Sequence, residues 1–87
     1  MKNLNKLVRL YDNGGKTFDR YTAVYMNEPE YQPNTFAARG MSEHPFSPQG
    51  FGCSCTAMPG RHLGKRIKFE DLPKDCQRLV LQDLGDV

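Results

Sequence analysis

Hydrophobic positions gather at the two ends of this chain and are sparse in its middle. Near the start, two runs rich in aromatic and β-branched residues, 6–11 and 18–26, flank a polar stretch that contains Asn-Gly-Gly. Asn and Gly accept the positive φ angles that a tight connection between antiparallel strands needs. The pattern therefore predicts a long β-hairpin over residues 6–26.

The middle of the chain, residues 27–64, is rich in Gly and Pro and reads as irregular. It holds five of the six prolines, each of which removes a backbone donor. Two short segments within it, 35–41 and 51–57, have the composition of strands. We expect these segments to form the third and fourth strands, joined by turns.

In the C-terminal part, polar and apolar residues first alternate as in a strand, and apolar residues then recur with the spacing of a helix. Residues 65–69 alternate basic and apolar side chains, which is typical of a strand with one solvated face. Residues 72–84 place apolar side chains at i, i+4, i+7 and i+8, the spacing of one helix face. That face comprises Leu72, Cys76, Leu79 and Val80. We expect a helix over 72–84 that is capped by Asp71, carries Pro73 in its first turn and ends at Gly85.

These elements predict a single α+β domain over residues 1–87. We expect a small antiparallel sheet of four or five strands that starts with the long hairpin and continues as a meander, with the C-terminal helix packed on it. Leu, Val, Ile and Phe together make up 18 of 87 residues, so the core must be thin. The net charge of +2 is too low to indicate a disordered chain.

The charge is uneven along the chain, and one segment is strongly basic. Residues 61–68 carry four cationic side chains and no acidic one, whereas residues 69–87 have a net charge of −3. A basic segment of this density suits a phosphate backbone. It equally suits a solvated edge strand whose charges block pairing with other sheets.

Several classes of protein are disfavoured by the same composition. No apolar run approaches the ~20 residues of a membrane span, and the start of the chain lacks a signal-peptide core. Three cysteines without regular spacing indicate a reducing cytoplasm rather than a disulfide framework. No nucleophile elbow, phosphate loop or paired-carboxylate motif is present, so we expect a non-enzymatic protein without a cofactor.

A zinc site is one alternative interpretation. Cys53 and Cys55 would share one face of a strand, and His44 and His62 flank them in the sequence. Zinc prefers four such ligands in a tetrahedron. The spacing matches none of the usual zinc motifs, and buried cysteines often act as small hydrophobic residues, so we expect no metal.

A binding face for a macromolecule is the leading interpretation. Tyr and Arg dominate the hot spots of protein interfaces. The same side chains would suit nucleic acid, with cations on phosphates and tyrosines stacked on bases. The candidate binding residues are Arg9, Arg20, Tyr21, Tyr25, Arg39, Arg61, Lys65, Arg66 and Lys68.

Segments 9–24, 41–52, 60–67 and 69–78 together resemble a group of small proteins of bacteriophages, prophages and bacterial mobile elements that has no established common function. The resemblance implies a bacterial cytoplasm and a bacterial host protein or ribonucleoprotein complex as partner. Binding that inhibits a host defence system such as CRISPR is one form that this interaction would take. A structural phage component, recognisable by homo-oligomerisation, is a further alternative, for which Leu81 outside the helix stripe is a weak indication.

Overall fold

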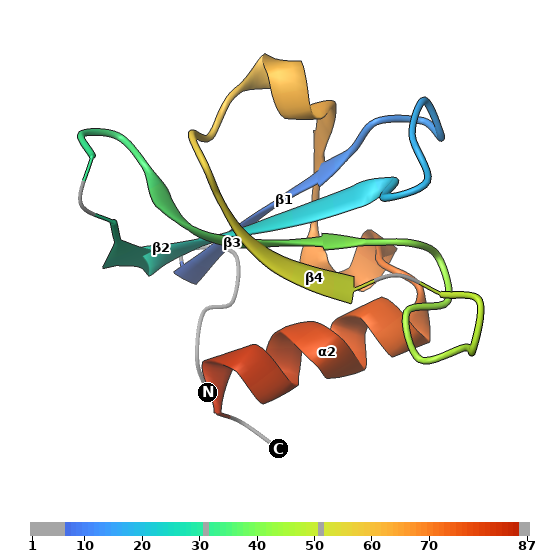
Figure 1. Ribbon diagram of the computed structural model, residues 1–87. Helices are drawn as coiled ribbons and strands as arrows, with labels where there is room; N and C mark the ends of the chain where they lie inside the picture. Colours follow the sequence, from blue (N-terminus) through green and yellow to red (C-terminus); the bar gives the residue numbers. More distant parts are fainter. Residues whose placement is uncertain (1–6, 31, 51, 86–87) are drawn as a thin grey trace.

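In the described part of the chain, a five-stranded antiparallel sheet with a C-terminal helix across it forms the fold (Figure 1). The computed structural model describes residues 7–30, 32–50 and 52–85. The strands are β1 (Val8–Asp12), β2 (Tyr21–Pro29), β3 (Phe36–Met41), β4 (Gly52–Ala57) and β5 (Lys65–Ile67). Two short 3₁₀ turns, η1 (Arg61–Leu63) and η2 (Phe69–Asp71), precede the helix α2 (Lys74–Leu84). The predicted α+β class is confirmed.

The N-terminal hairpin pairs β1 with β2 from Val8 opposite Tyr25 to Asp12 opposite Tyr21. Its second strand begins at Tyr21 rather than at residue 18, because side-chain hydrogen bonds occupy the residues before it. This strand also continues to Pro29, into the segment that the sequence predicts as a loop. The predicted starts of the hairpin at residue 6 and of the fourth strand at residue 51 lie outside the described residues.

The strand order is β4-β3-β2-β1-β5, so β1 to β4 form the predicted meander and only the position of β5 differs from it. β5 does not continue from β4; it pairs with β1 at the other edge of the sheet, with Leu10 opposite Ile67. The chain between β4 and β5 passes over the face of the sheet that α2 leaves open (Figure 1). Leu63 in this connection packs on a cluster of Tyr11, Val24 and Ala38, and that burial favours the crossing.

The other face of the sheet holds the larger core. Side chains of β1, β2 and β3 meet the apolar stripe of α2 there, as predicted. The buried members are Val8, Leu10, Tyr21, Ala23, Tyr25, Met41, Leu72, Cys76 and Val80. Helix and sheet thus hold between them most of the buried apolar side chains of the described residues.

The ends of α2 differ in part from the prediction. The helix begins at Lys74, and Asp71 does not cap it: the Asp71 carboxylate accepts a hydrogen bond from the backbone N–H of Lys68, the residue before η2 (3.1 Å). Gly85 ends the helix in the left-handed conformation, as predicted (φ 78°). Among the described residues, no helix has the length and apolar character that crossing a membrane requires.

A half-buried polar contact joins the last turn of α2 to the sheet. The Arg39 guanidinium binds the Asp83 carboxylate through two nitrogens, at 2.6 and 2.8 Å, and the Tyr25 hydroxyl donates to the same carboxylate. Burial, followed by this hydrogen bond, raises the pKa of Tyr25 well above its ordinary value. The pair leaves only about a fifth of each charged side chain exposed, so solvent screens it weakly.

We predict that Asp83→Asn destabilises the fold, because it leaves the half-buried Arg39 without a counter-charge. The free energy of unfolding should fall by about 1–3 kcal/mol in urea denaturation. Asp75→Asn is the matched control on the same helix, since its pair with Arg78 is long (3.6 Å) and exposed. That control should cost less than about 1 kcal/mol. Equal losses in the free energy of unfolding for the two variants would show that the Asp83 contact stabilises the fold no more than the exposed Asp75 pair does.

Candidate functional site

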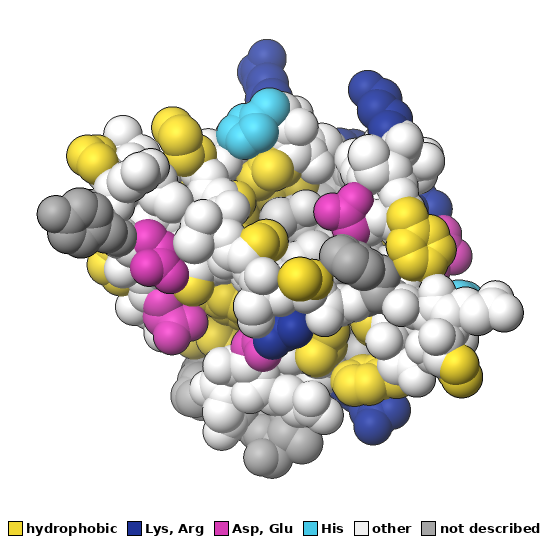
Figure 2. Space-filling view, viewed as in Figure 1, with side chains coloured by type: hydrophobic (Ala, Val, Ile, Leu, Met, Phe, Trp, Pro, Cys, Tyr) yellow, Lys and Arg dark blue, Asp and Glu magenta, His cyan; other side chains and the backbone are white. Residues whose placement is uncertain are grey.

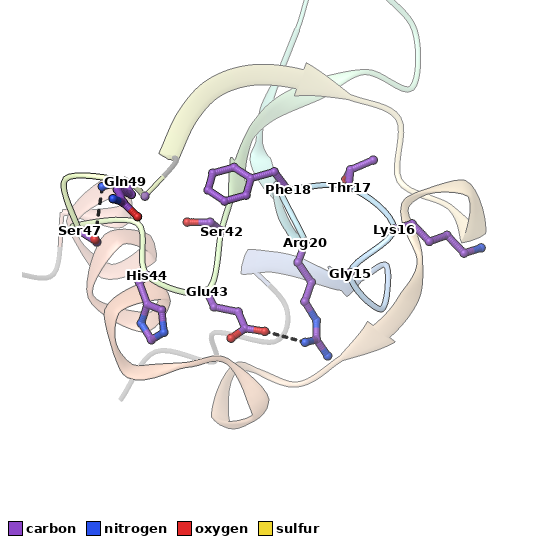
Figure 3. A pocket seen from close by; sticks show the side chains of 11 residues that line it. Gly15, Lys16, Thr17, Phe18, Arg20, Ser42, Glu43, His44, Ser47 and Gln49 are labelled. Atoms are coloured by element: carbon purple, nitrogen blue, oxygen red, sulfur yellow. Dashed lines mark hydrogen bonds and ion pairs between the residues drawn. The ribbon is translucent and has the colours of Figure 1, made fainter.

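A pocket lies between two connections of the sheet (Figure 3). One wall is the link between β1 and β2, and the other is the link between β3 and β4. Its volume is about 660 Å³. The lining residues are Gly15, Lys16, Thr17, Phe18, Arg20, Ser42, Glu43, His44, Ser47, Gln49 and Gly50.

Side-chain hydrogen bonds fix the first wall. The Asn13 carboxamide accepts from the backbone of Gly15 (2.8 Å) and donates to the Thr17 hydroxyl (2.8 Å). That hydroxyl donates in turn to Asp19 (2.6 Å). Gly14 and Gly15 both have positive φ angles (77° and 87°), which residues other than Gly, Asn and Asp rarely adopt. The connection is therefore held in one shape by local bonds rather than by a core.

Phe18 lies in the chain between Thr17 and Asp19, two members of this network, and its side chain is turned toward the opposite wall in Figure 3. It is 65% exposed, more than any other large hydrophobic residue in the part of the chain that the structure describes. A phenylalanine costs free energy when it is left in water. Because hydrogen bonds fix the turn that carries Phe18, the exposure of its ring follows from the fold and does not come from an unstructured loop.

The second wall is a series of turns through residues 42–50. The backbone N–H of Ser47 donates to the carbonyl of His44 (3.1 Å), and that of Gly50 donates to the carbonyl of Ser47 (2.8 Å). Gly50 approaches the His44 carbonyl so closely that a Cβ atom would lie 1.9 Å from its oxygen. The outer side of this wall is fixed to α2, because the Phe46 ring lies 4.7 Å from the guanidinium carbon of Arg78.

Arg20 joins the two walls. Its guanidinium binds the Asp12 carboxylate through two nitrogens, at 2.7 and 3.0 Å, and the Glu43 carboxylate through a third, at 2.7 Å. The Arg20 hydrogen bond, together with smaller contributions, holds the pKa of Asp12 below its usual value. The charged groups at the bottom of Figure 3 therefore act as a brace across the pocket.

The base of the second wall is tied to the helix through a thiol. Cys76 is fully buried, and its Sγ donates to the Ser42 carbonyl at 3.1 Å. Burial, aided by the charges of Asp75 and Glu43, raises the pKa of Cys76 to about 12. The thiol therefore stays protonated at neutral pH and keeps its hydrogen bond. Cys76 acts as a structural residue, as its place on the apolar helix face predicts.

The basic residues of segment 61–68 lie apart from this pocket. Arg61, Lys65 and Arg66 line a second hollow of about 490 Å³ beside Tyr11. Lys68 is exposed a little further along, and Arg9 is half-exposed on β1. None of these five cations forms an ion pair with a described residue. Figure 2 shows basic side chains projecting at the end of the molecule that carries η1.

Other predicted binding residues have structural roles instead. Tyr21 and Tyr25 are 6% and 3% exposed in the core under α2, so neither ring is available to stack on a base. Both lie on the sheet face opposite that of Tyr11. Arg39 is committed to Asp83 and Arg20 to the brace. The prediction that these tyrosines are exposed and stack on bases beside cations is therefore wrong, because the apolar stripe of α2 covers both rings.

The four candidate zinc ligands do not converge. Cys53 and Cys55 are exposed on β4, His44 lies in the second wall of the pocket, and His62 lies in η1. In the part of the chain that the structure describes, no three His, Cys, Asp or Glu residues are placed to hold a metal ion. The zinc alternative is not supported, because these residues lie on three separated segments.

Sequence reasoning missed Phe18, which it placed within a strand. A signal was available: Phe18 follows Asn-Gly-Gly-Lys-Thr directly, so it belongs to the turn-forming stretch.

Comparisons with protein-family models, curated proteins and solved structures found no match to the chain.

We predict that alkaline pH weakens the fold through Cys76. Between the ordinary pKa of 9.0 and the folded value of about 12, the unfolded chain releases a proton that the folded chain retains. Stability is thus full below pH 9 and falls as the pH rises, by about 1 kcal/mol from pH 8 to pH 10. Urea denaturation at both pH values measures the loss. Cys76→Ala should reduce the difference by at least half, whereas an unchanged difference would rule out the thiol as its source.

Proposed function

We propose that this chain is a non-enzymatic accessory protein of a phage or mobile element that acts by binding a bacterial host protein. The observation that carries the proposal is the exposed Phe18 ring, held on a hydrogen-bonded turn at the edge of the large pocket. An aromatic anchor that is already fixed loses little conformational entropy on binding. Such residues dominate the energetics of protein interfaces.

The chemistry of the pocket indicates what the partner must offer. An apolar side chain of the partner would pack on Phe18, and polar groups would meet Thr17, Ser47 and Gln49. Lys16, which forms no ion pair with a described residue, would favour an acidic group near the rim. The charged groups inside brace the two walls, which suits a surface that binds more than one that transfers protons.

The resemblance to phage and mobile-element proteins supports a bacterial host target. A small protein that carries one rigid binding site acts by occupying a surface of its target. Inhibition of a host defence complex such as a CRISPR effector is one form that this activity would take.

We predict that Phe18→Ser abolishes partner binding without weakening the fold. Its side chain is mostly exposed, so the free energy of unfolding should change by less than about 0.5 kcal/mol. Affinity capture from bacterial lysate, quantified by mass spectrometry, should enrich a host protein with the wild type and lose it with the variant. For the purified partner, Kd should rise at least about 30-fold, the effect of a hot spot of 2 kcal/mol.

Met58→Ser is the matched control, because Met58 is also exposed (52%) but does not line the pocket. This variant should capture the same partner as the wild type. Capture that is equal for both variants would contradict the proposal. Capture that survives Phe18→Ser but is lost on nuclease treatment or in high salt would instead indicate nucleic acid along segment 61–68.

A further inference from the structure

β4 is the exposed edge of the sheet and pairs only with β3 among the described residues. Gly52 to Thr56 are all exposed. An edge strand presents a row of backbone N–H and C=O groups that can pair with another strand. β4 lies at the front of the view in Figure 1.

The two edges of the sheet are built differently. β5 has three residues, two of them the exposed cations Lys65 and Arg66, and this is the usual protection against pairing with another sheet. β4 has six residues, Gly-Cys-Ser-Cys-Thr-Ala, without a charge or a proline. No charge or proline on this strand opposes a further strand at the normal spacing of about 4.8 Å.

The sequence of β4 is self-complementary about Ser54. If two copies pair antiparallel with Ser54 opposite Ser54, Cys53 of each copy lies opposite Cys55 of the other, and Gly52 lies opposite Thr56. Every cross-strand pair is then small and uncharged, so no like charges meet. A two-fold axis of this kind is the commonest symmetry of homodimers.

We infer that β4 is a homodimerisation edge, at which two copies of this chain join their sheets antiparallel around Ser54. The strand that binds there is β4 of a second copy, because in this register Gly52 to Thr56 each meet a small, uncharged residue of the other copy. The inference is independent of the partner proposed for the Phe18 pocket.

The two exposed cysteines make this register measurable. They lie on the face opposite α2, since Cys55 pairs with Ala38, a member of the cluster on that face. Directly opposite residues in an antiparallel pair have Cα atoms about 4.5–5.5 Å apart, within the reach of a disulfide. Diagonal neighbours are about 7–8 Å apart, which is beyond that reach.

Single-cysteine variants of this strand give the test. Cys53→Ser keeps Cys55, and Cys55→Ser keeps Cys53, so neither has opposed thiols in its own dimer. Mixed in equal amounts, the two variants oppose Cys55 of one copy to Cys53 of the other. Diamide would then form one S–S bond from two S–H groups, taking up two electrons and two protons to become the hydrazine. Using single variants also avoids a bond between the two cysteines of one strand.

The expected result is a covalent dimer in the mixture, at least tenfold faster than in either variant alone. Non-reducing electrophoresis and intact mass measure the product, which should be a heterodimer. Equal rates in the mixture and in the single variants would overturn the proposed register, and so would the absence of a covalent dimer from all samples. Both variants replace exposed residues, and circular dichroism verifies their folding.

A second pair of variants tests the dimer without a disulfide. Ser54→Lys places two like charges opposite each other at the axis, whereas a mixture of Ser54→Lys with Ser54→Glu places opposite ones there. Under reducing conditions, sedimentation equilibrium at high concentration should give a dimer for the wild type, a monomer for Ser54→Lys, and a dimer again for the mixture. A wild type that stays monomeric, or a dimer unaffected by Ser54→Lys, would refute the β4 interface.

Discussion

The contact of Asp83 with Arg39 and Tyr25 is the constraint on which the arrangement of helix and sheet depends. A chain with so few large apolar residues cannot fix the direction of α2 by packing alone. The bidentate ion pair defines where the last turn of the helix lies on β2 and β3. Near the other end, the Cys76 thiol reaches the Ser42 carbonyl. These polar contacts fix the orientation of the helix, and the apolar stripe between them supplies burial.

The pocket follows from this placement of the helix. Its second wall leaves the sheet at Ser42, which Cys76 holds, and its outer side rests on α2 through Phe46. The first wall needs no core, because Asn13 and its neighbours bond to one another. Arg20 then sets the distance between the walls. Changes in helix packing should therefore reach the pocket through its second wall, while the turn that presents Phe18 is locally determined.

Local patterns made much of the fold predictable. The hairpin and the helix stripe depend on nearby residues, whose periodicity can be read directly. The pairing of β5 with β1 depends on residues more than 50 positions apart, and no local signal distinguishes it from pairing with β4. Tyr21 and Tyr25 are four residues apart on one strand and share a face, but no local signal shows that α2 covers that face. Phe18 was assigned to a strand because composition does not show which residues a turn network will occupy.

The two proposed surfaces meet at the link between β3 and β4. Gly50 lines the pocket, and β4 begins at Gly52, so a strand added to β4 lies beside the end of the second wall. A dimer through β4 would carry two Phe18 pockets related by a two-fold axis. Against a host complex with repeated subunits, the second contact would be intramolecular, and the apparent affinity would rise without any new interaction. Dimerisation would thus let a chain of 87 residues bind such a complex more tightly than one Phe18 pocket can.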